Sequence, residues 1–170
     1  MNASESFSEE DYDYAQKTLR ILSGLYGVLR PLDLIQPYRL EMGTKLETEY
    51  GKNLYEFWGN SLTESLNKAL EESPGEKVLI NLASNEYFKS VHSGELEFPV
   101  MTPIFLDRKD GGDYKTVSFY AKRARGSMAS WIIRNRISQC EQFEEFGENG
   151  YEFCSERSNN QSPVFIRTNS

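Results

Sequence analysis

The feature that most constrains the fold of this 170-residue chain is a long helical pattern that leads directly into a short apolar run. Apolar side chains recur every three or four residues between Asn53 and Glu72, at Tyr55, Trp58, Leu62, Leu66 and Ala69. Ser73-Pro74-Gly75 ends this pattern, and Val78 to Ala83 then has the composition of a buried strand. A helix followed at once by a buried strand is typical of a mixed α/β domain.

The remaining segments extend the same pattern. Helical spacing predicts further helices over residues 8–22, 84–91 and 121–138. The turn residues Asp110-Gly111-Gly112 predict a β-hairpin between residues 103–107 and 114–120, and short strands are expected near 151–154 and 164–167. With no internal repeat and no linker, residues 1–170 are expected to form a single domain of the mixed α/β (α+β) class, with helices packed on a mixed sheet.

The acidic charge is concentrated near the two ends of the chain. The formal net charge is −7, but residues 1–14 carry five acids without a base, and residues 141–156 carry six more, again without a base. The body of the chain, residues 15–140, therefore has a net charge of about +2. Because local basic patches decide phosphate contact, the acidic total does not exclude a nucleic-acid partner.

The stretch from Lys115 to Arg136 contains six basic residues and no acid. In a helix, the apolar side chains of this stretch face the core, while five cations lie on its two flanks: Lys122, Arg125 and Arg136 on one, and Arg123 and Arg134 on the other. Arginine forks match phosphate oxygens, so this arrangement predicts a DNA-contacting surface. The alternative is a solvated face that pairs with the chain's own acidic tail, at Glu141, Glu144 and Glu145.

A glycine-containing turn precedes this region, in Leu22 to Pro31. A helix, a turn with Gly24 and Gly27, and the following Arg30 are similar to a helix-hairpin-helix DNA motif, in which glycines let the backbone approach a phosphate. The spacing departs from that motif, since two residues separate the glycines and Pro31 stands where a second helix would begin. An ordinary helix C-cap followed by a turn is the alternative.

Polar residues also follow the buried strand, where open α/β sheets place ligands. Glu86 is a candidate acid or base, Lys89 a candidate anion contact, and Asn85 a polar neighbour. The structural alternative is a Ser84 cap with an acidic residue in the first helical turn.

Other functional classes find little support. Cys140 and Cys154 are expected to be reduced thiols, and His92 is the only histidine, so we expect no metal site, no cofactor and no Ser-His-Asp arrangement. No phosphate-loop spacing is present. The polar N-terminus and the short apolar runs predict a cytosolic protein with no membrane association.

Several segments resemble the YaaA family of bacterial peroxide-stress proteins. They are Phe7 to Gln16 (FSEEDYDYAQ), Leu22 to Gly43 (LSGLYGVLRPLDLIQPYRLEMG), LYEFWG from Leu54, INLASNEYFKSV from Ile80, SFYAKRARG from Ser118, and the closing Tyr151-Glu152-Phe153 and Val164-Phe165. The resemblance implies an unusual mixed fold and a cytosolic protein that binds DNA through a helix-hairpin-helix element and a basic cleft. It also implies protection against hydrogen peroxide by keeping free intracellular iron low. Family members begin with a strand segment resembling I-S-P-A-K-T-L-D and a helical region before the part that corresponds to Phe7, so the chain looks like the family's C-terminal portion.

The residues together with this resemblance favour a DNA-binding protein of the peroxide stress response over an enzyme. We expect it to bind double-stranded DNA without sequence preference. The rival hypothesis is an enzyme acting on a nucleobase, nucleotide or phosphorylated small molecule through Asn85, Glu86 and Lys89. A third is a truncated remnant with no independent activity.

Overall fold

The computed structural model describes residues 3–109 and 111–169, and the contacts within the chain divide them into two compact units. Unit 1 contains the residues up to Ser8 together with Val78–Leu82 and the C-terminal part from Pro99. Unit 2 contains Glu9–Lys77 and Ala83–Phe98. Helices and a mixture of parallel and antiparallel strands confirm the α+β class, whereas the single domain stays a prediction.

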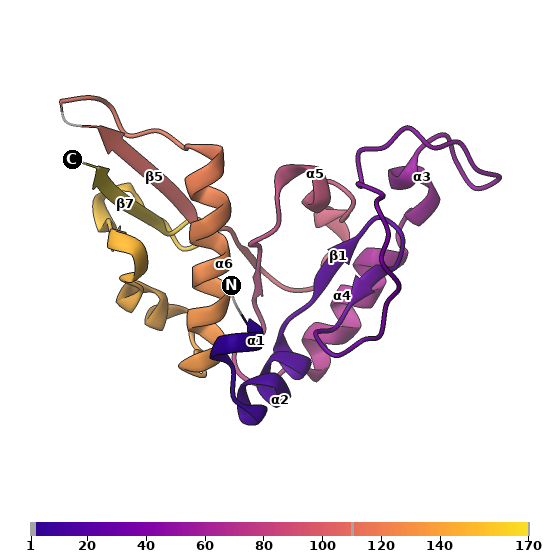
Figure 1. Cartoon of the computed structure of the whole chain (residues 1–170), viewed down its shortest axis with the longest axis horizontal. Helices are drawn as coiled ribbons and strands as arrows, with labels where there is room; N and C mark the ends of the chain where they lie inside the picture. Colours follow the sequence, from indigo (N-terminus) through magenta and orange to yellow (C-terminus); the bar gives the residue numbers. More distant parts are fainter. Residues whose placement is uncertain (1–2, 110, 170) are drawn as a thin grey trace. The chain divides into compact units, whose positions relative to one another are not determined.

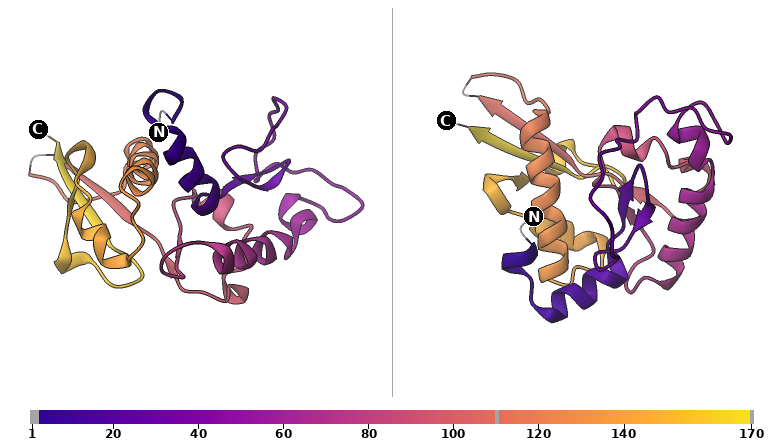
Figure 2. Two further views of the ribbon diagram at one scale, coloured as in Figure 1. Left: turned by 90° about the horizontal axis from the view of Figure 1, so that it is seen from below. Right: turned by 45° about the vertical axis from the view of Figure 1, so that its right-hand side comes forward.

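Unit 1 is built on a three-stranded sheet with the order β5-β7-β6 (Figure 1). Strands β5 (Ile104–Lys109) and β7 (Val164–Asn169) are parallel, while β6 (Glu152–Phe153) is antiparallel to β7. The long helix α6 (Ser118–Arg134) packs against β5 (Figure 2). The smaller elements are a parallel pair, β3 (Leu79–Ile80) with β4 (Val100–Met101), the short helix α1 (Ala3–Ser6), and the 3₁₀ helices η2 (Cys140–Glu145), η3 (Glu148–Gly150) and η4 (Ser155–Arg157).

Aromatic side chains form the core of unit 1. Phe105 of β5 stacks on Phe165 of β7 with ring centroids 5.5 Å apart, and it meets the Tyr151 ring edge-on at 5.3 Å. Helix α6 closes this core with Ala121 and Ala124, whose small side chains let the helix backbone approach the sheet. The apolar stripe expected for this helix is therefore the buried one.

Unit 2 begins with α2 (Glu9–Thr18) and the antiparallel hairpin of β1 (Ile21–Ser23) and β2 (Gly27–Leu29). A long irregular segment then leads to α3 (Leu54–Trp58), α4 (Ser61–Glu72), α5 (Asn85–Phe88) and the 3₁₀ helix η1 (Ser93–Glu95). Met42, Leu54 and Leu62 are buried together, and Trp58 and Tyr87 pack against them. The irregular segment is thus anchored to the helices through Met42.

Two predicted helices differ from the observed ones. The helix expected over 53–72 is divided at Gly59, whose φ of +48° is outside the helical range, so α3 and α4 are separate. The helix expected to reach Leu22 ends at Thr18, because Ile21–Ser23 pairs instead with Gly27–Leu29. No helix in the described ranges is long and apolar enough to cross a membrane.

The predicted hairpin after Pro103 is wrong in its second strand. Its turn residue Asp110 lies outside the described residues, and Tyr114–Val117 forms only an isolated bridge between Lys115 and Asp107. Ser118 already begins α6. The backbone of β5 instead pairs with β7, a strand far along the chain. The strand expected over 78–83 is also reduced, to the two residues of β3.

Candidate nucleic-acid interface

Helix α6 exposes two of the predicted cations without an acidic partner. Lys122 and Arg123 are exposed, and within the described part of the chain neither forms a salt bridge. The Arg123 guanidinium carbon lies 5.9 Å from the centre of the Phe119 ring, a neighbour on the same helix. Both charges are therefore available to an anion from outside.

Arg125 and Arg134 are engaged within unit 1. Arg125 is half-buried and its Nε donates to the Ala121 carbonyl at 3.3 Å. Burial lowers the pKa of this guanidinium, which still remains charged. Arg134 donates from Nη2 to Oε1 of Glu148 at 2.5 Å. Pairing with the acidic tail, the alternative to DNA contact, is thus seen at Arg134, although the partner is Glu148 instead of Glu141, Glu144 or Glu145.

Arg136 lies beyond the end of α6, because the helix stops at Arg134 and not near Ser138. Its φ of +53° is left-handed, and its Nη1 donates to the Ile133 carbonyl. The assignment of Arg136 to the helix flank of Lys122 and Arg125 is therefore wrong.

The two glycines of the hairpin are buried within unit 2. A Cβ on Gly24 would lie 2.6 Å from the Leu40 carbonyl oxygen. Gly27 has a φ of +75°, and a Cβ there would lie 2.9 Å from the Trp58 ring. The Trp58 indole also donates to the Gly24 carbonyl at 3.0 Å. Close packing accounts for both glycines, and their contact with DNA stays a prediction.

Arg30 directly follows β2, the second strand of the hairpin. Its Nε and Nη2 donate to Oδ1 of Asp33 at 3.2 and 3.1 Å, and its backbone N–H donates to Oδ2 at 2.8 Å. The backbone hydrogen bond is the main cause of the lowered pKa of Asp33. About half of the Arg30 side chain, 55%, is nevertheless exposed.

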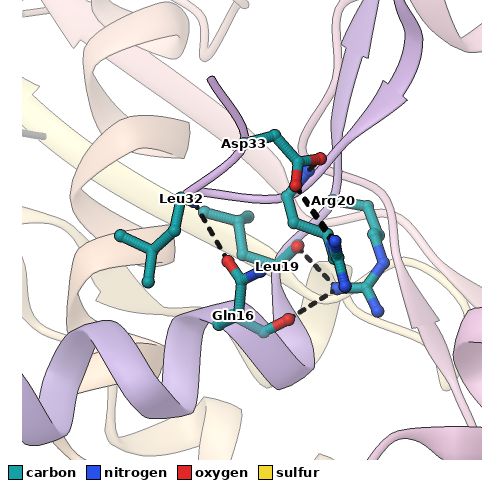
Figure 3. Close-up of polar contacts among 6 residues, drawn as sticks. Gln16, Leu19, Arg20, Leu32 and Asp33 are labelled. Carbon is teal, nitrogen blue, oxygen red and sulfur yellow. Dashed lines mark hydrogen bonds and ion pairs between the residues drawn. The ribbon is translucent and has the colours of Figure 1, made fainter.

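The end of α2 holds the base of this hairpin (Figure 3). Arg20 donates to the carbonyls of Gln16 and Leu19 at 3.1 and 2.9 Å, which caps the helix. The Gln16 side chain accepts the Leu32 N–H at 3.0 Å. Burial and, next, the charge of Arg30 lower the pKa of Arg20. A helix and a glycine-containing hairpin are thus joined, but residues 30–53 form no helix.

The candidate enzyme residues are exposed on the surface of unit 2. Glu86 accepts the Gly43 N–H at 2.8 Å and lines an open hollow of about 600 Å³ with Arg39, Glu41, Gly43 and Thr44. Asn85 and Lys89 are not among these lining residues, and Lys89 Nζ lies 5.2 Å from the centre of the Tyr55 ring. Ser84 caps α5, as the structural alternative predicted. The arrangement holds the loop at Gly43 in place, and an enzyme site at these residues stays a prediction.

Two groups of charged residues could not be found from the sequence. Arg108 and Arg157 lie over the Tyr114 ring, at 4.6 and 5.2 Å from its centre. Asp107 and Arg167 face each other in the β5–β7 register and form a salt bridge. Sequence offered no signal for either group. Asp107 and Arg167 meet only through the pairing of β5 with β7, and Arg157 lies far along the chain from Tyr114.

No cluster of three or more His, Cys, Asp or Glu side chains within the described ranges could hold a metal ion. Cys140 and Cys154 are partly buried free thiols, and neither forms a disulfide within the residues that the structure describes.

The sequence of the chain also matches a known protein family. The family model described as "Peroxide stress protein YaaA" matches residues 2–157, nearly the whole chain. This match begins before Phe7 and confirms the resemblance seen in the sequence segments, whereas the correspondence to a C-terminal portion of the family stays a prediction. The chain belongs to the YaaA family of peroxide stress proteins.

Proposed function

We propose that this chain is a DNA-binding protein of the peroxide stress response, and that the N-terminal half of α6 contacts duplex phosphates. The observation that carries the proposal is the exposure of Lys122 and Arg123, without acidic partners in the described residues, on a helix that lacks acids. Family membership supports the link to peroxide. The protein would act in the bacterial cytoplasm and limit damage driven by free iron, as the family resemblance implies.

The chemistry of the surface favours binding without sequence preference. Lysine and arginine contacts to phosphates fix a protein on DNA but do not read bases. Each contact releases counterions, so affinity falls steeply as salt rises. The acidic ends of the chain repel DNA, which confines contact to the basic regions.

Salt dependence tests the proposal directly. Duplex binding is measured by fluorescence anisotropy between about 50 and 200 mM salt for the wild type and for Lys122→Ala with Arg123→Ala. Loss of two phosphate contacts should flatten the slope of log affinity against log salt by about 1.8. Arg134→Ala is the matched control on the same helix, because Glu148 already neutralises Arg134. An unchanged slope in the double variant would refute the proposal.

The hairpin is proposed as a second, weaker contact. Arg30 is half-exposed beside the turn that carries Gly24 and Gly27, so its guanidinium can reach a phosphate while its Nε and Nη2 donate to Asp33. Arg30→Ala should then flatten the slope by less than about 0.9, since Asp33 already compensates part of the charge. If Arg30→Ala leaves the slope unchanged, DNA contact is confined to α6.

A further inference from the structure

A small cavity of about 160 Å³ opens in unit 1 beside α6. Its walls are formed by Tyr120, Arg123, Ala124, Asn149, Tyr151 and Arg167. These residues come from α6, η3, β7 and the residue that precedes β6, so the cavity is built by long-range packing. A volume of about 30 Å³ per water gives room for roughly five water-sized groups.

Arg167 is held rigidly at the floor of this cavity. Its Nε donates to Oδ1 of Asp107 at 2.7 Å, and the Asp107 side chain is only 3% exposed. Tyr151 donates its hydroxyl to the other carboxylate oxygen at 2.9 Å. The guanidinium carbon lies 4.6 Å from the centre of the Tyr120 ring and 4.5 Å from that of Tyr151. Asp107, Tyr120 and Tyr151 thus hold the Arg167 guanidinium in one position, which preorganises it for a ligand in the cavity.

Part of the hydrogen-bonding capacity of Arg167 is not used. Its Nη2 forms the salt bridge to Asp107 Oδ1 at 2.6 Å, without the alignment of a hydrogen bond. Nη1 donates at 3.3 Å to the Asn149 carbonyl. The guanidinium carries five N–H donors, and within the described residues hydrogen bonds are formed from Nε and Nη1 alone, so donors remain for a ligand.

The charge of the cavity favours an anion. Arg123, which also lines the cavity, has no salt bridge among the described residues, and in the same residues Arg167 forms a salt bridge with one carboxylate, that of Asp107. Two guanidinium groups therefore face one buried carboxylate. Guanidinium groups bind phosphate oxygens through paired hydrogen bonds.

We propose that this cavity binds a phosphate monoester group, with Arg123 and Arg167 as its ligands. One phosphorus with four oxygens matches the size of the cavity. A phosphate monoester is joined to the rest of its molecule by one ester bond, so the phosphate can enter the cavity while the rest stays outside. A phosphodiester within a duplex is joined by two ester bonds, and the cavity would have to accommodate both connections. The group belongs either to a phosphorylated DNA end or to a small molecule such as a nucleotide.

This inference goes beyond the proposed function, because it concerns one enclosed phosphate group and not the row of phosphates along a duplex. Arg123 takes part in both, but Lys122 does not line the cavity. Lys122→Ala is therefore the matched control: it removes a neighbouring charge of α6 and leaves the cavity intact.

Binding is measured by calorimetry for three probes: inorganic phosphate, adenosine 5′-monophosphate against adenosine, and a duplex with 5′-phosphates against the same duplex with 5′-hydroxyls. In at least one of the two pairs, the nucleotide pair or the duplex pair, we expect the phosphate-bearing member to bind at least about tenfold more tightly than its partner. Arg123→Ala should abolish that preference and Arg123→Lys should weaken it, since lysine keeps the charge but loses the fork. Lys122→Ala should retain it. Arg123 is exposed, so its variants are expected to fold, which thermal melting checks.

The pair that shows the preference identifies the source of the phosphate. Equal binding of both members in every pair would overturn the proposal. So would an equal loss of the preference for the phosphate-bearing member in Lys122→Ala and Arg123→Ala. If duplex binding depends on salt but is equally tight with and without 5′-phosphates, and the nucleotide pair also shows no preference, the cavity proposal is overturned and the proposed function stands. Binding of the nucleotide without any duplex binding would support the cavity and refute the proposed function.

Discussion

Tyr151→Phe removes one hydroxyl from the buried network of Asp107 and Arg167 and leaves the rest in place. The Tyr151 residue is 1% exposed and donates to the Asp107 carboxylate at 2.9 Å. A hydrogen bond to a charged group contributes about 1.5–3 kcal/mol. The phenylalanine ring preserves the contact with Phe105, so the loss of unfolding free energy at neutral pH should lie in this range.

The same substitution should change how stability depends on pH. Burial and, next, the hydrogen bond to Asp107 raise the pKa of Tyr151 above its ordinary value of 10.0. Above pH 10 the unfolded chain releases this proton while the folded chain keeps it, so the wild type loses about 1.4 kcal/mol per pH unit from this group. The variant has no such proton. The difference in unfolding free energy between the wild type and Tyr151→Phe should therefore be constant below pH 10 and should decrease above it.

Urea unfolding at pH 8 and at pH 11 measures both effects. Tryptophan fluorescence reports on unit 1 alone when both proteins carry Trp58→Phe, because Trp131 packs against the core of unit 1. Tyr50→Phe is the control, since Tyr50 is 68% exposed. If the stability difference between the Tyr151 variant and its parent is the same at both pH values, the protonated Tyr151–Asp107 contact does not stabilise the fold as argued.

Two further predictions concern unit 2. Gly27→Ala should lower its stability by at least about 1–3 kcal/mol because of the positive φ and the Trp58 ring, whereas Gly94→Ala, where an added Cβ meets nothing within 4 Å, should change thermal stability far less. Glu86→Ala should speed hydrogen exchange of the Gly43 amide by releasing its 2.8 Å hydrogen bond, and Glu86→Gln should largely preserve its protection. Unchanged exchange in Glu86→Ala would show that Glu86 does not hold the loop.

Local patterns predicted the helical positions and their buried sides. The stripe that includes Leu62 and Leu66 is buried in α4, and Ala121 and Ala124 are buried in α6, because periodicity reports which side of a helix faces the core. The predicted ends were less accurate. Gly59 divides one helix through its own backbone conformation, and the pairing of Ile21–Ser23 with Gly27–Leu29 shortens another.

Long-range pairing explains what the sequence could not show. The turn after β5 is typical of a hairpin, yet β5 pairs with β7 in parallel, a partner that no local pattern specifies. That register alone brings Asp107 opposite Arg167 and so creates the floor of the cavity. The candidate phosphate site depends on topology and not on a motif.

The structure also shows that the number of cations in a stretch does not equal the number available for binding. Folding of unit 1 pairs Arg134 with Glu148 at the C-terminal end of α6 and partly buries Arg125, so these two cations are less available than their number suggests. The N-terminal half keeps Lys122 and Arg123 exposed, and its first turn contains no acid. The helix dipole adds partial positive charge at that same end. The two exposed cations of α6 that form no salt bridge within the described residues, Lys122 and Arg123, thus lie toward the end at which Arg123 borders the cavity.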